Sequence, residues 1–253
     1  MLKFFRRIRQ KLIAERNLKK YLLYAIGEVL LIIIGILLAL QLSNLNEGAK
    51  EDKLANQYLE RLLADLTKDT TYYSLRIKAA RQGVDSTKVF IRDLYQTQQT
   101  EEEARRLFRN FELSTDPATT HNPAYLELSS TGKLSIITPS SLKEAIANYY
   151  RLNEELAANI EEVNSSSNGM LPMLFATASV VPRYMMSSFN DDSSGLSDDD
   201  WKFLNDPSSK EFQMLEGMAL IIYARNWELS SHFDRLDKAA KSLMNQIKEK
   251  LEQ

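Results

Sequence analysis

Few side chains in this sequence have the types and spacing that catalysis or metal binding requires. The chain has 253 residues, no Cys and only two His, His121 and His232. This excludes disulfides, thiolate nucleophiles and Cys-based metal centres, and it leaves little material for an imidazole-built site. No nucleophile-elbow, Walker or dinucleotide-binding glycine motif is present. We therefore expect no enzyme activity, no cofactor and no metal, with structural roles for both His and with the many Asp and Glu on solvated helix faces.

The acidic stretch 190–200 comes nearest to a metal-binding loop. Gly195 stands where an EF-hand has its central glycine, but the position that should hold the bidentate Glu is Trp201. A helix N-cap at Ser197, followed by three Asp at the positive end of the helix dipole, explains the stretch better than calcium binding.

One carboxylate is unusual because of its surroundings. Glu28 lies in residues 21–42, a run in which Gln41 is the only other strongly polar side chain. An ionisable group inside an apolar span is a functional-site hypothesis by default. Three explanations remain open: a hydrogen bond that fixes register in a homo-oligomer or reaches Tyr24, proton or ion coupling with a polytopic partner, and pairing with a basic residue of another protein. The second rests on an analogy of layout with energising stator subunits.

Small residues lie on the same side of this segment as Glu28. At 100° per residue, Gly35 and Ala39 fall about 20° from Glu28, and Tyr24 falls about 40° away. Small side chains permit close helix approach, so this stripe is predicted to be a helix-packing face.

The apolar run is long enough to cross a membrane. Its 22 residues correspond to about 33 Å of helix, compared with about 30 Å for a hydrocarbon core. A cleaved signal peptide would have a shorter apolar region and a small-x-small site after it, and neither is present. We therefore predict an uncleaved signal-anchor.

Charge predicts the orientation of this anchor. Residues 1–20 hold eight basic side chains and one acidic one, whereas the whole chain has a net charge of −2. Basic residues keep their side of a first span in the cytoplasm, so the protein should lie in a bacterial inner membrane with its C-terminal part periplasmic. The basic segment either lies on anionic headgroups or only orients insertion. With the rest of the chain acidic, lipid is the expected partner and nucleic acid is not.

The remaining sequence predicts an all-α fold: one N-terminal transmembrane helix followed by an extracytoplasmic helical bundle with long heptad-patterned helices. The predicted organisation is a cytoplasmic basic segment at 1–20, the anchor at 21–43, a linker at 44–53 and a periplasmic helical domain at 54–253. The linker offers a point at Gly48 where the helix can bend.

Three apolar seams carry this prediction, with spacings of three and four residues typical of packed helices. The first is Leu62, Leu66, Thr70, Tyr73, Ile77, Ala80, Val84, Thr87, Ile91 and Leu94; the second is Leu142, Ile146, Tyr149, Asn153, Leu156, Ile160 and Val163; the third is Phe212, Leu215, Ala219, Ile222, Asn226, Leu229, Phe233, Leu236, Ala240, Leu243 and Ile247. Because a buried Asn destabilises unless it is paired, we predict that Asn153 and Asn226 lie at one level of the bundle and fix its register.

Shorter elements connect these seams. Asn122 before Pro123 and Thr131 before Gly132 predict a helix over residues 123–131. Residues 133–138 are expected to be extended, residues 164–169 to form a loop, and residues 170–188 to form a Met-rich helix interrupted at Pro182. That helix fits an ordinary core helix better than a partner-binding groove.

Several segments together resemble a large family of uncharacterised single-pass membrane proteins of Bacteroidetes. They are MLKFFRRIRQKL at 1–12, KYLLYAIGE at 20–28, GILLALQ at 35–41, the polar exit at 44–47, and YLELSSTGKL at 125–134 followed by Tyr149 and Tyr150. The resemblance implies an envelope location and offers no activity. The positions it singles out are Tyr125, Glu127, Ser129, Ser130 and Gly132, which a capped helix and a packed turn explain without a ligand.

These observations predict a non-enzymatic membrane protein whose periplasmic bundle contacts other proteins, either as a homo-oligomer or within an envelope assembly. The alternative is a ligand-sensing or ion-coupled accessory subunit that uses Glu28 with a polytopic membrane partner. Sensing requires a polar-lined cavity between helices, and a solid apolar interior would count against it.

Overall fold

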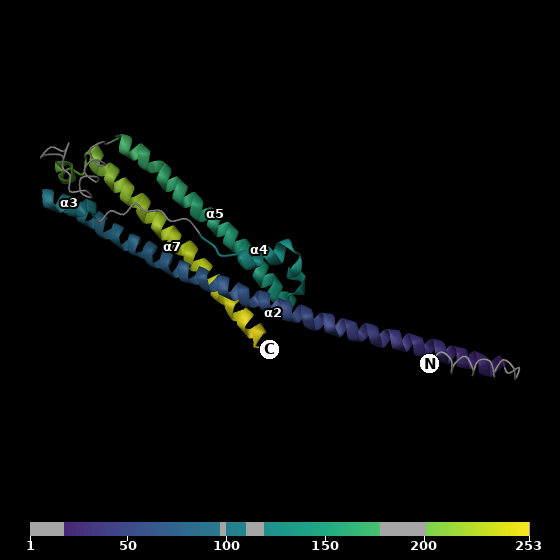
Figure 1. Cartoon of the computed structure of the whole chain (residues 1–253). Helices are drawn as coiled ribbons and strands as arrows, with labels where there is room; N and C mark the ends of the chain where they lie inside the picture. Colours follow the sequence, from purple (N-terminus) through teal and green to yellow (C-terminus); the bar gives the residue numbers. More distant parts are fainter. Residues whose placement is uncertain (1–17, 97–99, 110–118, 178–200, 253) are drawn as a thin grey trace. The chain divides into compact units, whose positions relative to one another are not determined.

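The described part of the protein is helical throughout. A computed structural model describes residues 18–96, 100–109, 119–177 and 201–252 (Figure 1). In chain order the elements are α2 (Leu18–Leu94), α3 (Glu101–Arg109), α4 (Pro123–Ser130), the 3-10 helix η1 (Lys133–Ile136), α5 (Ser140–Thr177), the 3-10 helix η2 (Lys202–Asn205) and α7 (Lys210–Leu251). Within these residues the all-helical class predicted from the periodicity is confirmed. The chain forms two compact units, residues 1–57 and 58–253.

The described part of the first unit is the N-terminal part of α2. Large apolar side chains are exposed at successive positions along this helix, which include Leu22, Ile26, Ile33 and Leu40. An 18-residue window has a mean hydropathy of 2.5 and none of it is buried. By length and composition α2 can cross a membrane, as predicted. The helix continues without a break through residues 44–53, the segment predicted to be a linker.

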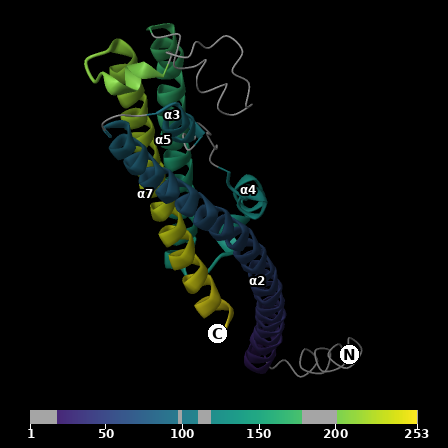
Figure 2. The same ribbon diagram turned by 90° about the vertical axis from the view of Figure 1, so that its left-hand side faces the viewer.

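The second unit is held together by the three predicted seams. Most seam residues of α2, α5 and α7 are buried, including Leu66, Ile146 and Leu215, which are fully buried. Helices α5 and α7 lie side by side in both views (Figures 1 and 2). At one end of this unit, Phe90 and Leu94 of α2 pack with Leu107 of α3 and with the first turns of α7.

Two local predictions are wrong. Residues 133–136 of the segment predicted to be extended are helical instead, because Gly132 adopts a left-handed φ of 70° and η1 follows directly, with the Ser135 hydroxyl donating to the Gly132 carbonyl; Ile137 has the extended backbone predicted. Residues 164–169 are not a loop, because α5 continues through them to Thr177. The Ser167 hydroxyl donates to the Val163 carbonyl, which shows how a Ser-rich run remains helical.

The short helix α4 is confirmed close to its predicted bounds, with Pro123 at its first position and Gly132 beyond its end. The predicted core helix at 170–188 is described only to Thr177, where it forms the end of α5. Pro182, the acidic stretch 190–200 and the basic segment 1–17 lie outside the described residues.

Candidate functional site

The two seam asparagines are buried but do not share a level. Asn153 donates from Nδ2 to the Tyr73 hydroxyl at 2.7 Å, whereas the Asn226 side chain lies against Gly83. Gly83 follows Tyr73 by ten residues on α2, which is about 15 Å of helix. The expectation of a common level is therefore wrong, because each Asn contacts its own position on α2. A role in register stays a prediction.

The stripe predicted around Glu28 lies on the exposed apolar part of α2. Glu28 is half-buried, Ala39 is exposed, and no heavy atom lies within 4 Å of a Cβ built on Gly35. The side chain of Tyr24 lies outside the described part. Their proposed packing therefore stays a prediction.

The five positions singled out by the resemblance separate into two groups. Tyr125 and Glu127 of α4 make contacts with other helices. The hydroxyls of Ser129 and Ser130 donate to carbonyls three residues earlier in the same helix, and Gly132 supplies the left-handed turn. The second group therefore shapes the end of α4.

Two buried carboxylates on α2 hold the start of α4. Asp65 accepts the backbone N–H of Ala124 at 3.2 Å, and Asp69, one helical turn later, accepts the backbone N–H of His121 at 2.7 Å. The side chain of Asn122, predicted to be the N-cap, makes no capping hydrogen bond. The first turn of α4 is thus capped by Asp65 of another helix, and Asp69 holds the residue just before the N-cap position, which suits the positive end of a helix.

Asp69 is the centre of this arrangement and is fully buried. In addition to the His121 amide it contacts the His121 ring, 2.9 Å from Nδ1, and it accepts from the Tyr149 hydroxyl at 3.2 Å. Burial raises the pKa of Asp69, whereas the hydrogen bonds from His121 and Tyr149 act to lower it. The group joins α2 to α5 and to the segment before α4.

Tyrosines surround the two carboxylates. The Tyr125 ring stacks on Tyr150 with centroids 3.9 Å apart and planes 9° apart. Burial is the main cause that raises the pKa of both Tyr149 and Tyr150, so both hydroxyls remain neutral. The Tyr150 hydroxyl is buried and has no hydrogen-bond partner among the described residues.

A second polar group joins α4 to α2 at the surface. Glu127 accepts from the Tyr58 hydroxyl at 2.6 Å and pairs with Arg61 at 2.7 Å. Lys133 donates to the Tyr58 hydroxyl at 3.3 Å. The bonds from Arg61 and Tyr58 hold the pKa of Glu127 below its usual range. The ion pair of Arg61 and Glu127 is exposed, although Tyr58 is buried, so the pair contributes less to stability than Asp69.

The contacts of this arrangement join helices of the same unit. The described hydrogen bonds of Asp65, Asp69 and Glu127 connect residues 119–137 to α2. Through Tyr149, Asp69 also connects α2 to α5. Within the described residues no group of three potential metal ligands is found. The expected structural role of His121 is consistent with its contact to Asp69.

Sequence reasoning missed Asp65 and Asp69, which it assigned to solvated helix faces. Asp65 and Asp69 each stand three residues after a fully buried leucine of the first seam, Leu62 and Leu66 respectively, so they lie on the same side of α2. Acidic residues one turn apart beside such a seam were the available signal, but the donors that they bind lie more than fifty residues further along the chain.

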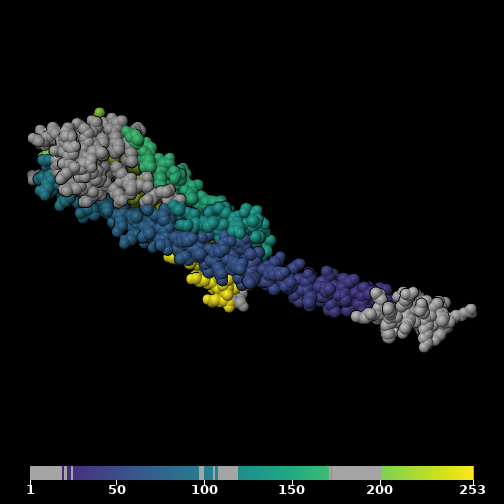
Figure 3. Space-filling view, in the orientation of Figure 1, coloured from purple at the N-terminus to yellow at the C-terminus, as the bar shows by residue number. Residues whose placement is uncertain are grey.

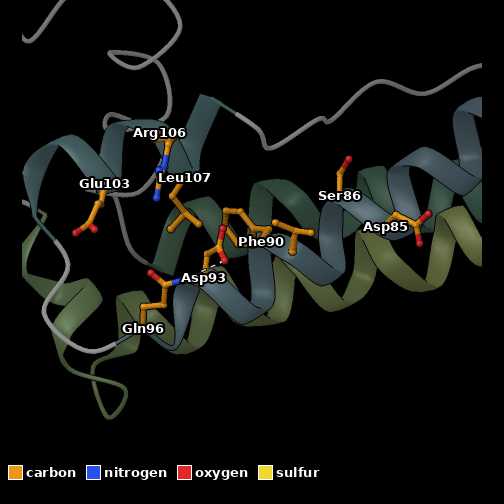
Figure 4. Close-up of a pocket in the computed structure, with 9 residues that line it drawn as sticks. Asp85, Ser86, Phe90, Asp93, Gln96, Glu103, Arg106 and Leu107 are labelled. Atoms are coloured by element: carbon orange, nitrogen blue, oxygen red, sulfur yellow. Dashed lines mark hydrogen bonds between the residues drawn. The ribbon is translucent and has the colours of Figure 1, made fainter.

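One surface groove of about 340 Å³ lies between the last turns of α2 and helix α3 (Figure 4). Phe90 and Leu107 supply its apolar part, and Asp93, Glu103 and Arg106 are among its polar side chains. Glu103 accepts from the amide and hydroxyl of Thr100 and so completes the cap of α3. The polar side chains of the groove are thus partly engaged within the chain.

The chain belongs to a family of unknown function, DUF6090, whose model matches residues 28–178. The match includes Glu28, α4, both buried carboxylates and all of α5. Neither the curated proteins nor the solved structures gave a match to the chain.

Proposed function

We propose that this protein is a single-pass inner-membrane protein without enzyme activity, anchored by residues 21–43, whose residues 54–253 form a periplasmic helical bundle that contacts other proteins of the envelope. A second copy of the chain is one candidate partner. A bacterium of the Bacteroidetes type is the proposed source, on the resemblance of the N-terminal segment.

The observation that carries the proposal is the exposure of the apolar part of α2. A core helix of similar composition in a soluble protein would be mostly buried, whereas none of this window is. At about 25 cal/mol per Å² of apolar surface, leaving so many Leu and Ile side chains in water would cost far more than a folded domain can sustain. Lipid is the solvent that accepts such a helix.

Anchoring is tested by paired substitutions. Ile33→Arg with Leu37→Arg should release the protein from membranes at alkaline pH, because each Arg near the centre of a span costs about 2.5–3.5 kcal/mol on insertion scales. Leu75→Arg is the matched control, since Leu75 is also exposed but lies in the second unit. Wild-type protein recovered in the soluble fraction would refute the proposal.

Orientation is tested by reporters at the C-terminus. Alkaline phosphatase fused after residue 253 should be active, because it folds only in the periplasm. Green fluorescent protein at the same place should be dark, because it becomes fluorescent only when it folds in the cytoplasm. The opposite pattern would place residues 54–253 in the cytoplasm and refute the orientation.

Glu28 supports a second candidate function, an ion-coupled or ligand-sensing accessory subunit. The supporting observation is an ionisable side chain on the exposed apolar part of α2. Glu28→Gln separates the two functions. If Glu28 only fixes register, a neutral isostere is tolerated and crosslinked oligomers persist. If Glu28 couples ions, the neutral side chain abolishes function, and cells with the variant behave like cells from which the gene has been deleted.

A further inference from the structure

Residues 119–137 are attached to the rest of their unit by a few apolar side chains, by the stack of Tyr125 on Tyr150, and by polar contacts. We call this segment, which contains α4 and η1, the latch. Its fully buried apolar side chains are Ala124, Leu128 and Ile137. By contrast, α7 buries at least one side chain in every turn from Phe212 to Ile247. The latch lies at the surface of the unit beside α2, in teal in Figure 3.

The hydrogen bonds of the latch to the rest of the unit form two groups. In the first, Asp69 accepts the amide and contacts the ring of His121, Asp65 accepts the Ala124 amide, and the Thr120 hydroxyl donates to Asn153 at 2.6 Å. In the second, Glu127 pairs with Arg61, and Lys133 donates to Tyr58. Water can replace each of these partners when the contact breaks, so the net contribution of each bond is small compared with that of a packed core.

The latch also has internal bonds that do not depend on α2. The Thr131 amide donates to the Glu127 carbonyl at 3.1 Å, and α4 packs on η1. The seams of α2, α5 and α7 contact one another without it. Gly83 approaches Asn226 and Tyr73 packs near Phe233 between α2 and α7. Asn153 of α5 bonds Tyr73 of α2, and α5 packs along α7. Segments with few buried apolar contacts open at lower free energy than the core around them.

We propose that the latch opens as a unit while α2, α5 and α7 remain folded, and that Asp65 and Asp69 set the fraction of time it is closed. Opening removes the cover from Asp69, Tyr149 and Tyr150, which are buried when the latch is closed. Asp69 has the larger effect of the two carboxylates because it binds both the latch and α5.

Hydrogen exchange of the full chain in detergent tests this proposal. In the wild type, amides of residues 124–131 should exchange at least tenfold faster than amides of the buried turns at 66–73, 146–156 and 229–243. Asp69→Asn should increase the latch rate by a further factor of ten or more, because an NH₂ group replaces one of the two acceptor oxygens and either the His121 donors or the Tyr149 hydroxyl lose their acceptor. Amides of residues 229–243, which exchange only when the whole unit unfolds, should accelerate by no more than the same factor.

The matched control is Asp234→Asn, which removes an exposed carboxylate that pairs with Arg81 and Lys238. It should leave the latch rate unchanged. If Asp69→Asn does not fold, Glu127→Gln tests the second group of bonds and should raise the latch rate. Latch amides that exchange at the same rate as the core in the wild type would overturn the proposal, as would a latch rate that neither variant raises.

Discussion

Gly83→Ala tests how closely α2 and α7 approach. An added Cβ would lie 2.3 Å from Nδ2 and 2.9 Å from Cγ of Asn226, well inside normal contact distance. Asn226 is itself buried, so its side chain has little room to move. We therefore expect overpacking that costs about 1–3 kcal/mol.

The helix preference of Ala acts in the opposite direction and must be measured separately. Replacing a helical Gly by Ala stabilises by about 0.5–1 kcal/mol where there is space. Gly217 on α7 is the matched control, because nothing lies within 4 Å of a Cβ there. Gly217→Ala should therefore be stabilising, and Gly83→Ala should be less stable than it by about 1–3 kcal/mol.

Thermal unfolding of the full chain in detergent, followed by circular dichroism, measures the difference. A domain of this size shifts by about 2–4 °C per kcal/mol, so the two variants should differ by roughly 2–12 °C. Adding Asn226→Ala to Gly83→Ala should recover part of the loss, since the clashing atoms are gone. Equal melting temperatures for Gly83→Ala and Gly217→Ala would refute the close approach.

Three further predictions concern the polar and aromatic contacts. Asp69→Asn should destabilise by about 1–3 kcal/mol in chemical denaturation, because Asn keeps one acceptor oxygen and leaves some of the buried donors without one, whereas the exposed pair of Asp234 should matter by less than about 1 kcal/mol. Burial lowers the pKa of His232, so its contribution to stability is complete above pH 6.5 and is lost as pH falls through the lowered pKa; His232→Gln should remove this part of the pH dependence between pH 7 and 5. Tyr125→Leu should cost about 0.5–1.5 kcal/mol through loss of the stack on Tyr150, measured in the same denaturation series.

Each of these predictions has an outcome that contradicts it. Equal losses for the Asp69 and Asp234 variants would mean that the buried acceptor has no special role. A wild-type stability that rises as pH falls from 7 to 5, or the same slope in His232→Gln, would contradict the sign given for His232. A Tyr125→Leu variant as stable as the wild type would show that the stack adds nothing beyond apolar contact.

The periodicity of the sequence predicted the long helices well, since burial repeats along them at every turn. Leu142, Ile146 and Tyr149 are buried as their spacing indicates, and the same is true of α7 from Phe212 to Ile247. Failures came where side chains compete with local propensity. The Ser167 hydroxyl bonds within its own helix, so a run that resembles a loop is helical.

The candidate site was only partly predictable, because its two halves are far apart in sequence. Tyr125 and Glu127 were singled out by the resemblance alone. It did not indicate that Tyr125 stacks on Tyr150 or that Glu127 accepts from Tyr58. The levels of Asn153 and Asn226 depend on where each helix meets α2, and a heptad pattern does not contain that offset. Contacts between elements at long separation require the fold itself.

The cap of α4 has a consequence for the order in which the chain acquires its structure. An eight-residue helix has little stability alone. This one takes a first-turn acceptor, Asp65, and the acceptor for the segment before it, Asp69, from residues made more than fifty positions earlier. During synthesis from the N-terminus, Asp65 and Asp69 leave the ribosome before His121 and Ala124, so the template precedes the segment that it organises. A peptide of residues 119–137 on its own should therefore be unstructured in water, and a circular permutant that begins at residue 119 would have to make this helix before its acceptors exist.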